Sequence, residues 1–301
     1  MFANDSAAGI TATGIYFKEE KNISIEKEEL FISEEKIEGS YIFKNHSTED
    51  ITTEIAFPMP DYDYDISGTT VEPMYDDFTV EINGKKINHK EESRAFVNKT
   101  DYTKLLNEMG VSIKDFGNFY NYDFHEALGR EKLPRPKYFF ESLSQKQKQL
   151  LLKAKLVVNE GNIAIPNWTV SRKYYWTQTF PAKGILAIKH SYSPYKSFDY
   201  VSSEETFYKE ACIDKETDKW LKGQPYPHYY RFVDYILTTA NNWKQPIKTF
   251  RLIVNSGGYE NSIRVSSCFP KKLIKTTPSL YEATVTNFVP KQNITIYFIG
   301  H

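Results

Sequence analysis

Alternation of apolar and polar residues along the first ninety positions is the feature that most constrains this fold. In KIEGSYIFKN, residues 36–45, apolar or small side chains interleave with polar ones, and further alternating runs lie at 23–33 and 51–57. A period of two, broken by polar gaps, is typical of half-buried β-strands. The inward set is Ile23, Ile25, Leu30, Ile32, Ile37, Gly39, Tyr41, Phe43, Ile51, Ile55 and Phe57.

Turn signals separate these runs. Asn83-Gly84 stands between apolar positions and predicts a type I′ hairpin. Residues 181–184, Pro-Ala-Lys-Gly, predict a second hairpin turn between the strand patterns 169–180 and 185–192. No helical pattern alternates with the strands of the first ninety residues, which disfavours a parallel α/β fold.

Residues 93–156 change to a helical period. Asp101 can cap one helix that stops at Gly110, and Ser144 to Gln147 form a capping box for another. We therefore predict a mainly β protein with a helical insert, of the α+β class. Its domains would be an N-terminal sandwich-like domain at 1–92, the insert at 93–156 and a C-terminal β-rich domain at 157–301.

Composition excludes some partners. The net charge is −1 over 301 residues, so no strong field of one sign would draw the chain to nucleic acid or an anionic membrane. No apolar run reaches the length of a membrane span. Aromatic residues make up 15% of the chain, which indicates either a bulky β core or an aromatic ligand platform, and the core is favoured.

The start of the chain and its two cysteines bear on location. Ala3-Asn4-Asp5-Ser6, a small residue followed by polar ones, resembles what remains after removal of a signal peptide. Cys212 and Cys268 would be expected to pair in an exported protein, whereas in the cytosol they would be two buried free thiols. Their spacing fits no zinc pattern.

Catalytic signals are sparse. The chain lacks GxSxG, GxxxxGK[ST] and GxGxxG, and His125-Glu126 starts a zincin motif whose second His is replaced by Gly129. We predict no cofactor and assign no catalytic residue. A hydrolase would have to gather residues from distant positions, and the candidates are His125, Glu126, His190 and His228.

Two groups of residues are candidates for binding. Aromatic side chains around the strand pattern 169–180 could stack on a sugar or peptide, although packing in the core is the favoured interpretation. This group is Trp168, Tyr174, Tyr175, Trp176, His190 and Tyr192.

DYDYDISGTTVE, residues 61–72, forms the second group, because its carboxylates have nearly the spacing of a calcium loop. The carboxylates are Asp61, Asp63, Asp65 and Glu72. Ile66 replaces the glycine that such a loop needs at its sixth position, and no helix pattern precedes it. An acidic turn is therefore the favoured interpretation.

Several stretches together resemble a family of bacterial exported proteins of unknown function. They are ANDS (3–6), EELFIS (28–33), KIEGSYIFKN (36–45), AFPMP (56–60), NWTV (167–170), YYWTQTFPA (174–182), IKHSYSP (188–194), TTANNW (238–243) and PIKTFRLIV (246–254). The resemblance covers nearly the whole chain. It implies export by a signal peptide to the periplasm or beyond, which agrees with a Cys212–Cys268 disulfide, and it implies no activity.

Two classes of function follow. The first is a non-enzymatic binding protein that uses a groove between its domains, with a glycan, a peptide or another protein as its partner. The second is an extracytoplasmic hydrolase. A histidine within hydrogen-bond reach of a carboxylate and a nucleophile in a cleft would favour the second.

Overall fold

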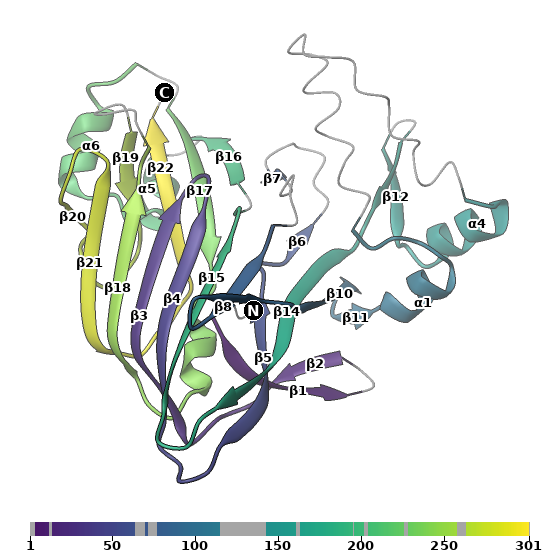
Figure 1. The fold of residues 1–301 in the computed structure, drawn as a ribbon. Helices are drawn as coiled ribbons and strands as arrows, with labels where there is room; N and C mark the ends of the chain where they lie inside the picture. Colours follow the sequence, from purple (N-terminus) through teal and green to yellow (C-terminus); the bar gives the residue numbers. More distant parts are fainter. Residues whose placement is uncertain are drawn as a thin grey trace. The chain divides into compact units, whose positions relative to one another are not determined.

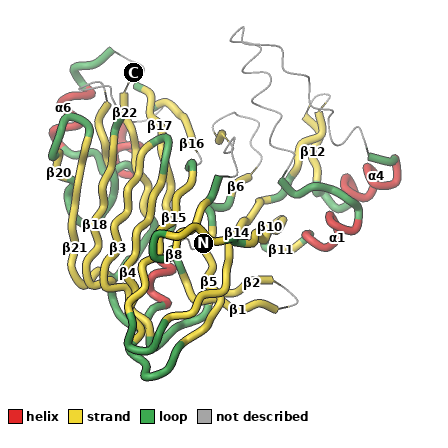
Figure 2. Tube along the Cα trace, viewed as in Figure 1, coloured by secondary structure: helices red, strands yellow, loops and turns green. Residues whose placement is uncertain are grey.

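The computed structural model describes residues 4–11, 14–63, 70–71, 77–114, 143–160, 163–194, 196–201, 204–225, 228–257 and 263–300. Strands dominate these residues, as Figure 2 shows, and confirm the mainly β prediction. Among the described helices, none is long and apolar enough to cross a membrane.

The chain forms two compact units, and these do not follow the predicted domain ranges. Unit 1 combines residues 1–60, 73–90 and 174–301, and unit 2 combines 61–72 and 91–173. The reason is long-range strand pairing. β3 (Ile23–Ser33) lies parallel to β18 (Ile247–Asn255), so that the N-terminal and C-terminal β regions share one sheet.

Two facing sheets make up the sandwich of unit 1 (Figure 1). The larger has the order β20-β21-β18-β3-β4-β15-β8-β9, and the smaller contains β19-β22-β17-β16. The remaining strands of the larger sheet are β20 (Ile274–Lys275), β21 (Leu280–Phe288), β4 (Ile37–Asn45), β15 (Ile185–Tyr192), β8 (Thr79–Ile82) and β9 (Lys85–Ile87). Those of the smaller are β19 (Ile263–Ser266), β22 (Ile294–Gly300), β17 (Tyr229–Tyr235) and β16 (Lys196–Tyr200).

The described part of unit 1 also contains three further strands, the second half of β14 (Thr169–Phe180) and three short helices. β5 (Ile51–Pro58) pairs with β1 (Ser6–Thr11), and β1 pairs with β2 (Gly14–Phe17). The helices are α5 (Glu204–Glu210), α6 (Lys215–Leu221) and the 3-10 helix η2 (Thr238–Asn242). Cys212, between α5 and α6, forms the expected disulfide with Cys268.

Unit 2 contains the helical elements predicted for the insert. Its described helices are α1 (Thr103–Glu108) and α4 (Gln145–Lys153), and Ser144 with Gln147 forms the predicted capping box of α4. Its strands are β6 (Tyr62–Asp63), β7 (Thr70–Val71), β10 (Lys90–Val97), β11 (Thr100–Asp101), β12 (Val157–Glu160) and β13 (Ile163–Pro166). β14 (Thr169–Phe180) begins in unit 2 and ends in unit 1.

The two predicted turns have different outcomes. Asn83 and Gly84 both have positive φ, 49° and 77°, and connect the paired strands β8 and β9, as a type I′ hairpin requires. Residues 181–184 also form a turn, in which the Gly184 amide donates to the Pro181 carbonyl. The strands that flank this turn are not partners, because β15 pairs with β4 and β8, so the predicted hairpin there is wrong.

Aromatic side chains fill the interior of unit 1. The core cluster contains Tyr41, Phe43 and Phe250 from the larger sheet and Tyr235 and Phe298 from the smaller one, all at most 2% exposed. The high aromatic content therefore serves mainly to fill the space between two sheets, whose inner faces lie about 10 Å apart in such folds.

Candidate functional site

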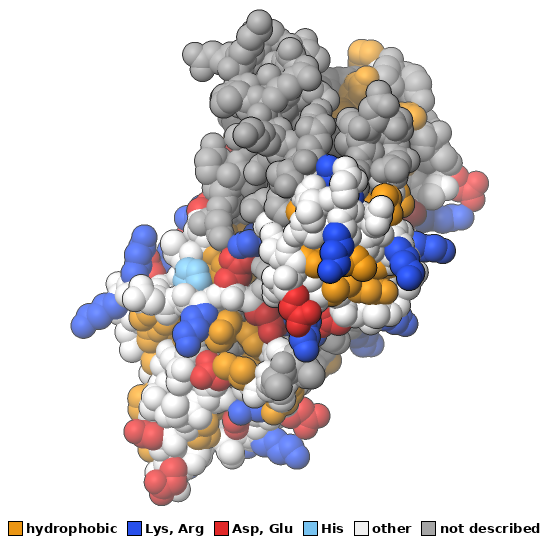
Figure 3. All heavy atoms as spheres, turned by 90° about the vertical axis from the view of Figure 1, so that its right-hand side faces the viewer, with side chains coloured by type: hydrophobic (Ala, Val, Ile, Leu, Met, Phe, Trp, Pro, Cys, Tyr) orange, Lys and Arg blue, Asp and Glu red, His pale blue; other side chains and the backbone are white. Residues whose placement is uncertain are grey.

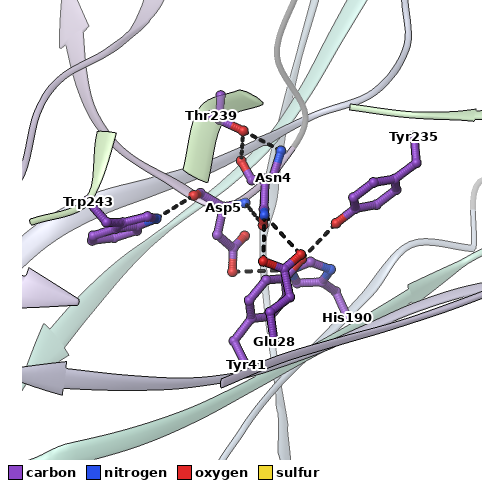
Figure 4. Close-up of polar contacts among 8 residues, drawn as sticks. All are labelled: Asn4, Asp5, Glu28, Tyr41, His190, Tyr235, Thr239 and Trp243. Atoms are coloured by element: carbon purple, nitrogen blue, oxygen red, sulfur yellow. Dashed lines mark hydrogen bonds and ion pairs between the residues drawn. The ribbon is translucent and has the colours of Figure 1, made fainter. Parts of the chain in front are cut away.

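A polar cluster lies inside the sandwich of unit 1, where an apolar core would be expected (Figure 4). Five segments contribute to it: the start of the chain, β3, β4, β15 and the stretch from β17 to just beyond η2. The members of this buried polar cluster are Asn4, Asp5, Glu28, Tyr41, His190, Tyr235, Thr239 and Trp243.

Direct contacts join the side chains of the cluster. The Asn4 Nδ2 donates to both carboxyl oxygens of Glu28, at 2.9 Å and 2.9 Å, and the hydroxyls of Tyr41 and Tyr235 lie 2.7 Å apart. Asp5 Oδ2 and His190 Nε2 lie 3.1 Å apart, within ion-pair distance, but the angles between the two groups do not meet the geometry of a hydrogen bond. Glu28 and Asp5 are both fully buried.

Burial raises the pKa values of three members of the cluster, Glu28, Tyr41 and Tyr235. It raises the pKa of Glu28 to about 8, the neighbouring Asp5 carboxylate adds to the rise, and the hydrogen bonds from Asn4 and Tyr41 oppose it. Glu28 is therefore mostly protonated at neutral pH. Burial likewise raises the pKa values of Tyr41 and Tyr235 well above that of a free tyrosine.

A β-bulge explains why an acidic residue points inward. The pairing of β3 with β4 shifts register between Ile25 and Lys27. Before the shift, the odd positions Ile23 and Ile25 are buried; after it, the even positions Glu28 and Leu30 are buried. The sequence carries this signal, because the apolar set changes from odd to even positions between Ile25 and Leu30.

The cluster anchors the segment that precedes β1. The Thr239 hydroxyl donates to the Asn4 carbonyl at 2.6 Å and accepts a hydrogen bond from the Asn4 amide. The Trp243 indole donates to the Asp5 carbonyl at 2.7 Å, and Asn242 Nδ2 donates to the Ser6 hydroxyl at 2.8 Å. ANDS and TTANNW, which both carry the family resemblance, therefore bind each other. Because its members are buried, we interpret the cluster as structural.

The aromatic candidates lie mostly in the interior. Tyr174 is stacked on Phe78 with ring centroids 4.1 Å apart, and the Trp168 indole donates to the Ile113 carbonyl. Tyr175 is half-buried beside Lys90. Trp168, Tyr174, Trp176, His190 and Tyr192 are at most 4% exposed, which leaves little ring area for a ligand. Their part in binding stays a prediction.

The acidic stretch at 61–72 is described only in part. Asp65 and Glu72 lie outside the described residues. Asp63 accepts a hydrogen bond from the Thr169 hydroxyl, and burial raises the pKa of Asp61. Within the described part of the chain, no group of three or more His, Cys, Asp or Glu side chains could hold a metal ion. Calcium binding by the complete loop stays a prediction.

The histidines give no catalytic arrangement among the residues that the structure describes. His125 and Glu126 fall outside these residues, and His190 meets Asp5 only in the closed interior. Ser24 Oγ lies 2.7 Å from His46 Nε2 and donates to Glu26 Oε1 at 2.8 Å. In a catalytic triad the carboxylate orients the imidazole, whereas here it binds the hydroxyl.

An apolar pocket of about 340 Å³ opens in unit 1, beside the disulfide. Its inner wall is made by Leu237, Phe269, Phe288 and Ile294, which are all at most 9% exposed. The remaining lining residues are Cys268, Pro270, Val285, Val289, Lys291, Gln292 and Asn293, and we call this site the Phe269–Phe288 pocket. The sequence carries no signal for this pocket, because its walls come from β21, from the start of β22 and from separate loops that carry no motif.

Local structure holds this wall in place. The Phe269 and Phe288 rings meet edge to face at 5.7 Å, and Phe250 packs behind both. The disulfide fixes Cys268, whose carbonyl also accepts from Gln292 Nε2 at 3.1 Å. Ligand pockets commonly have volumes of about 300–1,000 Å³ and mostly apolar linings, so this pocket is suited to a small ligand.

A pair of exposed rings was also missed. Phe198 and Tyr229 are 45% and 38% exposed and stack with centroids 5.5 Å apart. They share a face with Tyr200 and Arg231, and Arg231 binds Glu34 at 2.9 Å. The alternation in Phe198-Asp199-Tyr200 was the available signal.

Charged side chains of both signs are interspersed over the described part of the face in Figure 3. Within unit 2, Arg94 pairs with Asp101 and Lys104 pairs with Glu108. This mixing agrees with the near-zero net charge.

Comparison with known proteins identifies a family whose function is unknown. The family model for "Domain of unknown function (DUF4424)" matches residues 3–297. No curated protein matches the chain. Among solved structures, the chain is similar to a "putative nutrient binding protein" from Legionella pneumophila, with 12% identity and a TM-score of 0.41, over 98% of this chain and 72% of that one. At this level of similarity, nothing about the ligand of that protein transfers to this chain.

Proposed function

Because the chain belongs to the DUF4424 family, which has no described function, we propose from its own geometry that it is an exported, non-enzymatic binding protein. The ligand is a small molecule with a largely apolar body, and it binds in the Phe269–Phe288 pocket. The observation that carries this proposal is the pocket itself, a preformed concave site of about 340 Å³ with a buried apolar inner wall.

Location outside the cytoplasm is supported by the disulfide. Cys212 and Cys268 form a disulfide, and disulfides persist in oxidising compartments and are rare in the cytosol. The resemblance to exported proteins supports the same location, periplasmic or secreted.

Binding is better supported than hydrolysis. The pocket is lined by apolar side chains, by two side-chain amides that are already hydrogen-bonded and by one lysine, Lys291, whereas a hydrolase needs a base and a nucleophile that face a cleft. Our sequence-based hypothesis placed the ligand in a groove between domains; the site proposed here lies wholly within unit 1.

A fluorescence assay with N-phenyl-1-naphthylamine, a neutral apolar dye, tests the proposal. The full chain should bind the dye, and Val285→Trp, which fills the pocket, should abolish binding. Thr284→Trp on the exposed side of the same strand is the matched control and should bind as the native protein does. The absence of dye binding by the native chain, or equal binding by Val285→Trp, would overturn the proposal.

The exposed rings favour a second candidate function, the binding of a glycan. Sugar rings stack on exposed aromatic faces, and the Arg231–Glu34 pair offers polar partners beside Phe198 and Tyr229. Tyr229→Ala should then remove glycan-array signals and leave dye binding unchanged. A native chain without any glycan signal rejects this second candidate.

A further inference from the structure

The polar groups around the Phe269–Phe288 pocket are mostly engaged within the protein. Asn293 Oδ1 accepts from the Leu237 amide and the Thr238 hydroxyl, at 3.2 and 3.3 Å. Gln292 Nε2 donates to the Cys268 carbonyl at 3.1 Å. A ligand therefore meets apolar surface along the inner wall, rather than a set of hydrogen-bonding groups.

One lysine, Lys291, lines the pocket. Of the described residues that line it, only Lys291 is a basic or acidic residue, and no ion pair to Lys291 is found within the described part of the chain. The two lysines that follow the lining residue Pro270 in the sequence are engaged: Lys271 Nζ donates to the Thr284 carbonyl at 2.7 Å, and Lys272 pairs with Asp214 at 2.9 Å.

The lining residues of the pocket differ in exposure between its two ends. Leu237, Phe269, Phe288 and Ile294 form its closed end and are buried, whereas Val289 is 47% exposed and Lys291 to Asn293 are exposed. The cation therefore lies at the open side and the apolar wall at the closed side. A ligand that matches this arrangement has an apolar body at one end and a negative charge at the other.

We propose that the pocket binds anionic amphiphiles, molecules with one alkyl chain and a carboxylate head, and that Lys291 binds the head. This inference rests on the proposed function, because it names the ligand class of the same pocket. The alkyl chain lies against Phe269 and Phe288, and the carboxylate lies at the mouth. Lysine suits this role as a flexible point charge that needs no fixed planar geometry.

Two contributions would determine the affinity: burial of the alkyl chain and the contact of the carboxylate head with Lys291. Each methylene that leaves water tightens binding by about fourfold until the closed end is full. A pocket of about 340 Å³ has room for a chain of medium length only, so the gain should stop in longer chains. The head adds a charge-assisted contact with Lys291, which a neutral alcohol would not make with equal strength.

Isothermal titration of the native full chain tests the proposal, with every probe kept below the concentration at which it forms micelles. Octanoate and decanoate should show the methylene gain, and decanoate should bind about tenfold more tightly than 1-decanol. Lys291→Met should weaken decanoate by about tenfold and leave 1-decanol unchanged. Lys291→Arg should retain decanoate binding. Lys85→Met, at an exposed lysine on β9, is the matched control and should bind as the native chain does.

The outcomes separate this inference from the proposed function. Equal binding of decanoate and 1-decanol, both weakened by Val285→Trp and neither by Lys291→Met, would overturn the anionic class and keep the pocket. Failure of decanoate, 1-decanol and the neutral dye to bind would overturn the proposed function itself. Stronger binding of decylamine than of decanoate would also overturn the inference.

Discussion

Glu28 shows how one residue can depend on a detail of its strand. In a regular strand its place in the sequence would put it on the same face as Glu26, next to solvent. The bulge between Ile25 and Lys27 turns it into the core, where Asn4 and Tyr41 take the place of water. A buried carboxyl group is tolerated there because it holds a proton at neutral pH.

Titration of Glu28 should make the stability of the protein fall as pH rises. The folded pKa of about 8 lies above the ordinary value of 4.5, so the native state holds this proton over a range in which the unfolded chain releases it. Stability from this group is full below pH 4.5 and is lost as pH rises through about 8. Glu28→Gln should remove this slope, of about 1.4 kcal/mol per pH unit at most, in urea unfolding from pH 5 to 8.

Glu38→Gln is the control for this experiment. Although burial opposes the shift, hydrogen bonds from Lys189 and Lys36 hold the pKa of Glu38 below its usual value. Glu38 therefore stays ionised over the range tested, and its variant should keep the native slope. A Glu28→Gln curve that runs parallel to the native curve would contradict the assignment.

Gly39 is a second residue whose identity is set by the cluster. A Cβ atom there would come within 2.8 Å of the Tyr41 hydroxyl and 3.1 Å of His190 Cε1. Gly39→Ala should lower the free energy of unfolding by about 1–3 kcal/mol through overpacking. Gly223→Ala, where the nearest atom is the Trp220 carbonyl oxygen at 3.4 Å, should change it by less than about 0.5 kcal/mol. Urea unfolding measures both, and equal effects would reject overpacking.

At the scale of elements, the disulfide joins the α5–α6 turn to the segment that follows β19. This segment also forms one wall of the pocket, so the same bond supports the fold and the site.

Loss of the disulfide should destabilise the chain by about 4 kcal/mol in the chain-entropy model, because the bridge spans 56 positions. The double variant Cys212→Ser, Cys268→Ser should show this loss in urea unfolding. Reductant should lower the stability of the native chain to that of the variant and leave the variant unchanged. A similar response of the variant to reductant would show that the effect does not come from this bond.

At the scale of the whole molecule, unit 1 is assembled from three stretches of chain, and unit 2 interrupts it twice. The ends of the larger interruption meet within unit 1, where the rings of His89 and Tyr174 lie 5.2 Å apart. Insertions of this kind are tolerated where the ends of the host chain are close.

Replacement of residues 91–173 by a glycine-rich linker of about four residues should leave unit 1 able to fold. The residues that line the Phe269–Phe288 pocket all belong to unit 1, so dye affinity should stay at the native value. Circular dichroism and thermal unfolding measure folding, and fluorescence measures binding. A second variant with a linker of twice that length excludes strain at the junction. Failure of both variants to unfold cooperatively would show that unit 1 needs unit 2.

Much of the fold was readable from the sequence, because strands, hairpins and caps depend on neighbours. The alternation at 36–45 gave β4, Asn83-Gly84 gave a hairpin, and Ser144 gave a capping box. The candidate pocket could not be read in this way, because Leu237, Phe269 and Phe288 are ordinary apolar residues whose spacing means nothing until the sheets are packed.

The sequence by itself determined the β-rich class, the local turns and the short stretches that carry the family resemblance, since each depends on residues that are close along the chain. Only the tertiary structure decided that the N-terminal and C-terminal regions share one sheet and that Asp5 meets His190. It alone placed the apolar pocket beside the disulfide. These features depend on pairing and burial between segments more than a hundred residues apart in places, and no local pattern records which segments will meet.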